Sequence, residues 1–126
     1  MPEFQEHKLP FEKLLVWSSA KDVTKNIYGI TRNFPVDERF GLTNQMNRAA
    51  VSVMSNLAEG SARTSKKDQA HFSQIAYSSL MEVACQLQLA HELGYCSLES
   101  FQWIRQQILE LSSKINALRR TQLKEV

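Results

Sequence analysis

The chain has 126 residues, of which 43% are hydrophobic and 22% are charged, and its formal net charge at pH 7 is +2. This length predicts one domain whose core needs neither a metal nor a disulfide to hold it. The excess of positive charge is far below that of a strongly basic nucleic-acid-binding domain. No apolar run approaches the ~18 residues of a membrane span, and the N-terminus is acidic rather than signal-like, so we expect a cytoplasmic protein.

The first predicted elements are a lead and one helix. Residues 1–10 are polar and are predicted to be flexible. A helix over residues 11–32 is predicted from apolar and small residues spaced three and four apart. These residues are Trp17, Ala20, Thr24, Ile27 and Thr31. Pro35 ends this helix, because the residue before a proline avoids the α region. Residues 36–42 are predicted to form a loop or a single helical turn.

The second and third helices are predicted from their capping residues as well as from their apolar spacing. Thr43 is expected to cap a helix that runs to about residue 62. Ser65 is expected to cap a long helix over residues 66–93, which Gly94 ends from the C′ position. All three prolines precede residue 36, so little interrupts helix formation beyond that point.

The last helix is predicted to begin after Ser97 and to end in a basic tail. Its apolar residues follow a heptad spacing, namely Phe101, Ile104, Ile108, Leu111, Ile115 and Leu118. Four helices joined by short connections predict an all-α fold, specifically an antiparallel up-down four-helix bundle formed by residues 11–126 as a single domain.

Residues 45–63 are unusual because they carry two apolar faces. One face is expected to meet the core, and it contains Leu42, Met46, Ala49, Ala50, Val53, Leu57 and Gly60. The second face contains Val51, Met54 and Ala58. A helix that is apolar on opposite sides is usually buried on both. We therefore predict that the second face is the interface of a homo-oligomer.

A polar seam lies between these two faces, and we define it as Arg48, Ser52, Asn56 and Glu59, with Glu82 as a candidate partner from the third helix. One interpretation is an ordinary solvent-exposed stripe. The other is a buried network that locks two helices together, in which Glu59 neutralises Arg48 or another basic group and Asn56 bridges backbone or hydroxyl groups. The small residues around the seam favour the second interpretation, and burying these groups without partners would cost several kcal/mol.

We find no catalytic or metal-binding signature in the sequence. His7, His71 and His91 lack the Glu-x-x-His spacing of di-iron bundles. Cys85 and Cys96 fit no zinc motif and are predicted to be reduced thiols. The sequence therefore predicts a protein without enzymatic activity, cofactor, metal or small-molecule substrate.

Two basic clusters are candidates for contacts with nucleic acid. Arg63, Lys66 and Lys67 lie at the joint between the second and third helices, and Arg119 and Arg120 lie near the end of the last helix. They are either solvated helix ends or contacts to a phosphate backbone. We expect the two clusters to lie at opposite ends of the bundle and not to form one patch.

Several runs of residues resemble a known family. They include Leu15-Val16-Trp17, Glu38-Arg39-Phe40-Gly41-Leu42-Thr43, Arg48-Ala49-Ala50-Val51-Ser52 and Ser55-Asn56-Leu57-Ala58-Glu59-Gly60. Residues 11–118 in this way resemble the four-helix-bundle proteins of the 23S ribosomal RNA intervening-sequence family. The resemblance implies assembly into homopentameric rings and implies no catalytic residues. A related group, the accessory proteins of diversity-generating retroelements, shares the bundle and the ring and works with a reverse transcriptase and nucleic acid.

The leading hypothesis is a non-enzymatic, homo-oligomeric helical-bundle protein that binds structured RNA. One alternative is a protein-interaction scaffold without a role in nucleic-acid binding. Another is an RNA nuclease that uses Arg63 and His71, although these residues are eight apart and lie on different predicted helices.

Overall fold

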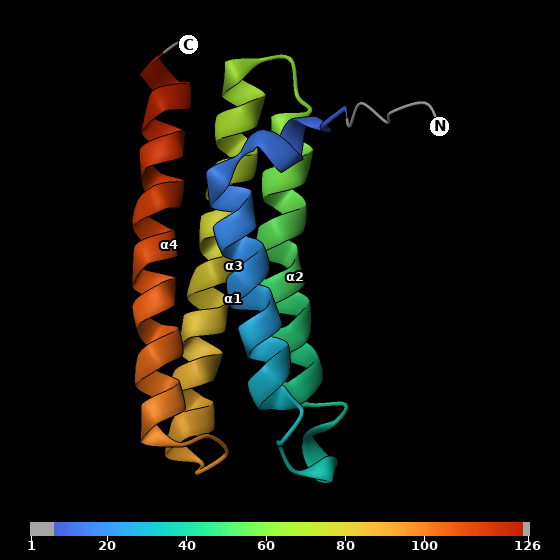
Figure 1. The fold of residues 1–126 in the computed structure, drawn as a ribbon, viewed down its shortest axis with the longest axis vertical. Helices are drawn as coiled ribbons and strands as arrows, with labels where there is room; N and C mark the ends of the chain where they lie inside the picture. Colours follow the sequence, from blue (N-terminus) through green and yellow to red (C-terminus); the bar gives the residue numbers. More distant parts are fainter. Residues whose placement is uncertain (1–6, 125–126) are drawn as a thin grey trace, which may run out of the picture.

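The computed structural model describes residues 7–124, and within them it contains four α-helices, two short 3-10 helices and no strand. The prediction of an all-α chain with four main helices is confirmed. The helices lie side by side (Figure 1), and their bounds are α1 Leu15–Thr31, α2 Leu42–Ser61, α3 Lys66–Glu92 and α4 Leu98–Lys124. Residues 1–6, the larger part of the predicted flexible lead, lie outside the described residues.

In the contacts between α1 and α2, residues further along α1 pair with residues nearer the start of α2. Thr24 Oγ1 donates to the carbonyl oxygen of Ala50 at 3.1 Å, and Thr31 Oγ1 donates to Oδ1 of Asn47 at 2.9 Å. The two helices therefore run in opposite directions. Figure 1 shows the same reversal between each helix and the next along the chain.

The α3–α4 pair shows this reversal at both of its ends. Near the start of α3, Ser73 Oγ donates to Oε1 of Gln122 at 2.7 Å, close to the end of α4. Near the end of α3, the His91 ring stacks on Phe101 of early α4, with 4.4 Å between the ring centroids. These contacts fix the register of α4 along its full length.

The chain enters α1 through the 3-10 helix η1, Pro10–Lys13, so the helix expected from residue 11 begins only at Leu15. The backbone N–H of Leu9 donates to Oε1 of Glu12 at 2.9 Å, which stabilises this short turn. Leu14 then has an extended backbone, with φ −85° and ψ 116°, and separates η1 from α1. A second 3-10 helix, η2 (Val36–Glu38), forms the single turn expected before α2.

The helix caps follow the sequence prediction at two of three N-termini. Ser65 accepts a 3.0 Å hydrogen bond from the backbone N–H of Asp68, and Ser97 accepts one of 3.1 Å from that of Ser100. The third prediction is wrong, because Gly41 rather than Thr43 precedes the first residue of α2. α2 therefore starts at Leu42, two residues earlier than a cap at Thr43 would place it, and a Cβ on Gly41 would lie 2.8 Å from Oε1 of Glu38.

Gly94 ends α3 in the left-handed conformation, with φ 79°. Its N–H donates to the carbonyl of His91 at 3.0 Å, and the N–H of Tyr95 donates to that of Ala90 at 2.9 Å. These two bonds form the Schellman arrangement that glycine permits at this position. The predicted role of Gly94 is thus confirmed.

The core runs along the centre of the bundle, and α2 contributes its predicted inward row in full. Leu42, Met46, Ala49, Ala50, Val53, Leu57 and Gly60 are all buried. The other three helices add buried rows of their own, which include Ile27, Leu80, Leu87, Ile104 and Ile115. Within residues 7–124, no helix is both long and apolar enough to cross a membrane.

α2 and α3 approach each other closely through small residues. A Cβ placed on Gly60 would lie 2.8 Å from the Cβ of Phe72, a separation that real side chains do not adopt. Further along the same pair, the hydroxyls of Ser52 and Ser79 are 2.9 Å apart and share a hydrogen bond. The small residues of α2 therefore set its distance from α3.

Candidate functional site

The two basic clusters lie at the same end of the bundle, so the expectation that they lie at opposite ends is wrong. Figure 1 shows the α2–α3 connection, the end of α4 and η1 together at the upper end. The hydrogen bond from Ser73 to Gln122 holds the start of α3 to the end of α4 at this level. The reason is topological, because in a chain of alternating helices the second connection and the end of the fourth helix share one end.

We define the basic end by the cationic residues that these segments contribute, namely Lys8, Lys13, Arg63, Lys66, Lys67, Arg119, Arg120 and Lys124. These eight cations are accompanied by only three carboxylates, Glu12, Glu59 and Asp68, which leaves a net charge of +5. Elsewhere in residues 7–124, seven cations balance seven carboxylates. The three remaining carboxylates, Glu3, Glu6 and Glu125, lie outside the described residues.

Local contacts hold the backbone of the basic end in place. Gln69 Nε2 donates to the carbonyl of Arg63 at 2.8 Å and closes the short α2–α3 connection. The buried bond between Ser73 and Gln122 attaches the last turn of α4 to α3. The cationic side chains therefore project from a backbone that does not need to be ordered when a partner binds, which lowers the entropic cost of binding.

Two arginines of the basic end are constrained by their surroundings. The guanidinium carbon of Arg63 lies 4.6 Å from the ring centroid of Phe72, and its Nη2 is 3.7 Å from Oε1 of Glu59. This ion pair is exposed and contributes little to stability. Arg119 differs, because its Nε is buried and has no hydrogen-bond partner among the described residues. The Arg119 guanidinium thus retains an unused donor close to the surface.

The polar seam divides into a bonded part and an exposed part. Asn56 Nδ2 donates to both the carbonyl and the Oγ of Ser52, at 2.8 Å and 3.0 Å, and Ser52 in turn meets Ser79 of α3. The Ser52–Ser79 hydrogen bond crosses from α2 to α3, whereas both hydrogen bonds of Asn56 stay within α2. Of the basic groups expected to pair with Glu59, Arg63 is the one that does, and Arg48 is not.

Arg48 and Glu82 lie in an open groove of about 390 Å³ between α2 and α3. Asn44, Gln45 and Ser52 also line it. Arg48 is exposed and forms no ion pair within residues 7–124, and Glu82 is exposed as well. The charged members of the seam therefore face solvent in the single chain.

Two residues of the predicted oligomer interface line a second groove, which we call the α1–α2 groove. Val51 is 39% exposed and Met54 is half-buried, and together they form part of a cavity of about 370 Å³. Its remaining lining residues are Lys21, Thr24, Lys25, Tyr28 and Arg32 of α1. The lining holds three cations and, among the described residues, no carboxylate. Ala58 is half-buried further along α2.

An exposed stripe of opposite character runs along α3, and we call it the α3 stripe. It contains Met81, Glu82, Cys85, Leu89 and Glu92, which are all exposed. Met81, Cys85 and Leu89 are spaced four apart and therefore lie on one helix face. The stripe carries two carboxylates and no cation. Its charge and apolar content are complementary to those of the α1–α2 groove.

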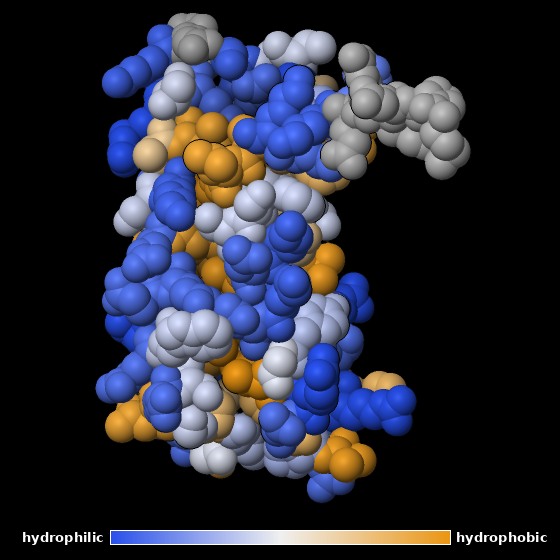
Figure 2. All heavy atoms as spheres, in the orientation of Figure 1, coloured by the Kyte–Doolittle hydropathy of each residue, from blue (hydrophilic) through white to orange (hydrophobic). Residues whose placement is uncertain are grey.

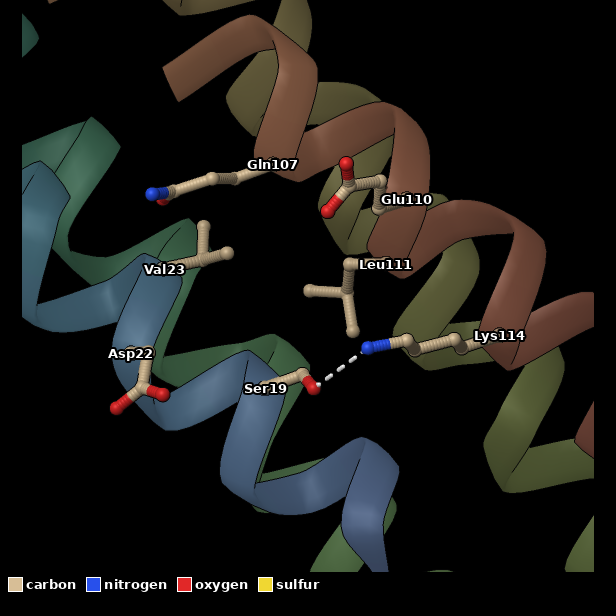
Figure 3. A pocket seen from close by; sticks show the side chains of 7 residues that line it. All are labelled: Ser19, Asp22, Val23, Gln107, Glu110, Leu111 and Lys114. Atoms are coloured by element: carbon tan, nitrogen blue, oxygen red, sulfur yellow. Dashed lines mark hydrogen bonds between the residues drawn. The ribbon is translucent and has the colours of Figure 1, made fainter. Parts of the chain in front are cut away.

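A third groove separates α1 from α4 and does not assemble a reactive centre. Figure 3 shows Val23 and Leu111 at its floor, while the carboxylate of Asp22 points away from that of Glu110. Lys114 Nζ donates to Ser19 Oγ at 3.1 Å across this groove of about 170 Å³. Nearer the start of α1, Leu14, Leu15 and Leu118 border an apolar groove, and Figure 2 shows a hydrophobic cluster in that region.

The histidines and cysteines do not gather into a site. The described residues contain no group of three or more His, Cys, Asp or Glu that could hold a metal. His71 lies on α3, eight residues from Arg63, and packs edge-on against Phe72, with 5.7 Å between the ring centroids. Cys85 is exposed and Cys96 is half-buried, and neither forms a disulfide. Burial raises the pKa of the Cys96 thiol.

Several residues of these surfaces are not predicted from the sequence alone. Residue spacing places Lys8 in the flexible lead and Lys13 in the first helix. Pro10 and Glu12 are the residues that indicate the short turn η1 at this point. The cations of the α1–α2 groove also went unnoticed, because they lie on a different helix from Val51 and Met54. Residue spacing within one helix does not reveal which neighbouring helix completes a groove.

The described residues form an all-α chain of antiparallel helices with one basic end (Figure 1). The family model of the 23S rRNA-intervening sequence protein matches residues 12–117, and the chain belongs to this family. No curated protein matches the chain. A crystal structure of a protein of unknown function from the S23 ribosomal protein family of Bacteroides thetaiotaomicron has the same fold. The TM-score is 0.75 at 21% identity, over 82% of this chain and 96% of that one.

Proposed function

We propose that this up-down four-helix bundle is a non-enzymatic protein that assembles with copies of itself and binds RNA through the phosphate backbone. The observation that carries the proposal is the concentration of eight cations against three carboxylates at one end of the bundle. Phosphate contacts from lysine and arginine supply most of the affinity of proteins for nucleic acids. The family name associates these proteins with ribosomal RNA, and this supports RNA as the partner.

The assembly we propose is a head-to-tail ring in which the α1–α2 groove of one copy receives the α3 stripe of the next. Lys21, Lys25 and Arg32 would meet Glu82 and Glu92, while Val51 and Met54 would pack against Met81 and Leu89. A pairing of two different surfaces generates a closed ring when its rotation closes. Resemblance to the family suggests five copies. A ring of this kind would bring the basic ends of all copies into one assembly and multiply their charge.

Light scattering of the purified protein tests the assembly. A single species of several copies at micromolar concentration is expected, whereas a clean monomer would contradict the ring. Reversing the charge of the groove with Lys21→Glu and Lys25→Glu should dissociate it. Adding Glu82→Lys and Glu92→Lys to the same chain should restore assembly if the two surfaces pair. Arg105→Glu, which changes one exposed charge outside both surfaces, is the control.

A salt titration with cellular RNA tests the binding function. The logarithm of the binding constant should fall linearly with the logarithm of the salt concentration, with a slope that grows with the number of phosphates neutralised. Absence of binding at low salt would exclude this function and favour the scaffold alternative. Unchanged RNA integrity in the presence of both the native protein and His71→Ala is expected of a protein without nuclease activity.

A further inference from the structure

Resting on the proposed function, we propose that the basic end binds the backbone of base-paired RNA and discriminates against single strands. Proteins that hold single-stranded nucleic acid combine a basic groove with aromatic side chains on which unpaired bases stack, and each stacked base contributes roughly 1–3 kcal/mol. A basic surface without such rings has contacts for phosphates but few for bases.

Among the described residues, the large aromatic rings at the basic end are Phe11, Trp17 and Phe72, and all three are already engaged. Phe72 is half-buried, with the guanidinium of Arg63 over its ring at 4.6 Å. Phe11 is also half-buried and packs edge-on against Trp17, with 4.6 Å between ring centroids. The exposed rings at this end of the described chain are therefore the imidazoles of His7 and His71, which offer little stacking area.

The large exposed rings among residues 7–124 lie elsewhere. Phe40 is 87% exposed, but it lies in the connection between α1 and α2, which Figure 1 places at the opposite end. Trp103 is 55% exposed in the second turn of α4, and Tyr28 is 41% exposed near the end of α1. Both of these positions are also nearer the end opposite to the cations. A strand held by the basic end would not reach these rings with the same nucleotides.

The number of charges at the basic end does not by itself favour one or two strands. With packed helices 8–10 Å apart and each about 10–12 Å wide, the end of the bundle is roughly 20 Å across. A duplex presents about 12 phosphates over that length, whereas one strand presents about 6. Eight cations against three carboxylates leave a net charge of +5, which either count of phosphates can neutralise, so the preference for a duplex rests on the engaged aromatic rings.

Arg119 supplies an independent sign of an unfilled contact. Its Nε is buried and finds no acceptor among the described residues. A buried donor without a partner is costly, so native structures usually satisfy it. Because this atom is buried, a phosphate oxygen at the end of α4 accepts its hydrogen bond only after the Arg119 side chain swings outward. Duplex binding would place such oxygens from two strands across the end of the bundle.

Fluorescence anisotropy with two labelled RNAs tests the inference. One is a hairpin with a stem of about 16 base pairs, and the other is an unstructured strand with the same number of phosphates. The native assembly should bind the hairpin at least roughly ten-fold more tightly at about 100 mM salt. Equal or tighter binding of the unstructured strand would overturn the inference and leave RNA binding intact. Binding of neither RNA would remove the proposed function itself.

A charge-matched pair of variants locates the contact. Lys67→Glu with Arg120→Glu reverses two exposed cations of the basic end and should weaken hairpin binding by about 10- to 100-fold. Arg39→Glu with Arg105→Glu makes the same change in net charge away from this end and should alter binding less than about three-fold. Equal losses in the two variants would overturn the assignment of the site. Circular dichroism and light scattering confirm that each variant folds and assembles.

Discussion

Ser73 Oγ donates a 2.7 Å hydrogen bond to Oε1 of Gln122, and both side chains are buried. The two residues are 49 apart in the sequence but lie at one level of the bundle, where α3 begins and α4 ends. The bond therefore joins the segments that carry the two basic clusters. Loss of either partner leaves the other polar group buried without its partner, which costs more than the hydrogen bond itself contributes.

We expect Ser73→Ala to lower the free energy of unfolding by about 1–3 kcal/mol, because it leaves the side-chain amide oxygen of Gln122 buried without a hydrogen bond. Urea unfolding measures the change. Ser113→Ala on the exposed side of α4 is the matched control and should remain within about 0.5 kcal/mol of the native protein. Equal values for the two variants would show that the buried bond does not stabilise the end of α4.

Gly60→Ala tests the close approach of α2 and α3. The added methyl would lie 2.8 Å from the Cβ of Phe72, so the helices would have to move apart, and we expect a loss of about 1–3 kcal/mol. Gly29→Ala is the opposite case, because a Cβ there meets nothing within 4 Å in the exposed part of α1. It should stabilise the protein by up to about 1 kcal/mol through helix propensity alone. Thermal unfolding of both variants would contradict this reading if Gly60→Ala were the more stable one.

The burial of Gly60 is predicted from the sequence, whereas the meeting of the two basic clusters at one end is not. The two outcomes have different physical causes. The inward row of α2 is fixed by a periodicity of 3.6 residues, which is local information, and each residue of that row is buried as expected. The direction of every preceding helix decides which cations lie at the same end of the bundle. Arg63 and Arg120 are far apart in the sequence, and no local sequence pattern indicates that they lie at the same end of the bundle.

The N-terminal boundaries of α1 and α2 show a second limit of sequence analysis. Thr43 has the right chemistry for a cap, yet Gly41 occupies that position, where a Cβ would lie 2.8 Å from Oε1 of Glu38. A hydroxyl residue marks only a favourable cap, and a glycine two residues earlier competes with it. Glu59 pairs with Arg63, four residues away, because Arg48 lies eleven residues earlier and therefore about 16 Å away along the helix.

The polar seam should respond unevenly to substitution. Asn56→Ala removes two hydrogen bonds to Ser52 from a half-buried position, and we expect a loss of about 1 kcal/mol. Glu59→Ala removes an exposed ion pair with Arg63 and should change stability by less than about 0.5 kcal/mol. Chemical unfolding at a protein concentration that keeps the chain monomeric measures both. A loss above about 1 kcal/mol for Glu59→Ala would contradict the assignment of its ion pair with Arg63 as an exposed, weakly stabilising contact.

The two cysteines should react with a thiol reagent at different rates. Cys85 is exposed on the α3 stripe, whereas Cys96 is half-buried and burial raises the pKa of its thiol, which lowers its thiolate fraction. We expect Cys85 to react faster in the dissociated Lys21→Glu, Lys25→Glu variant, and Cys85→Ser identifies the fast phase. In the assembled protein the reaction of Cys85 should slow, because the proposed interface covers it. An unchanged rate in the assembly would contradict the use of the α3 stripe.

Tyr95 should make the stability of the protein sensitive to alkaline pH. Burial, followed by the nearby carboxylate of Glu38, raises the pKa of the Tyr95 phenol above its ordinary value of about 10. Below that value the phenol is neutral in both the folded and the unfolded chain, so its contribution to stability is fully present. As the pH rises further, the unfolded chain loses this proton more readily than the folded one, and stability falls.

Tyr95→Phe keeps the ring beside Phe34, whose centroid lies 5.4 Å away, and removes the ionisable hydroxyl. Urea unfolding of this variant at several values between about pH 9 and pH 11 should show a shallower loss of stability than the native protein shows. Glu38→Gln removes the neighbouring charge but keeps the phenol, so its loss should be intermediate. If Tyr95→Phe lost stability as steeply as the native chain, other groups would have to account for the alkaline unfolding.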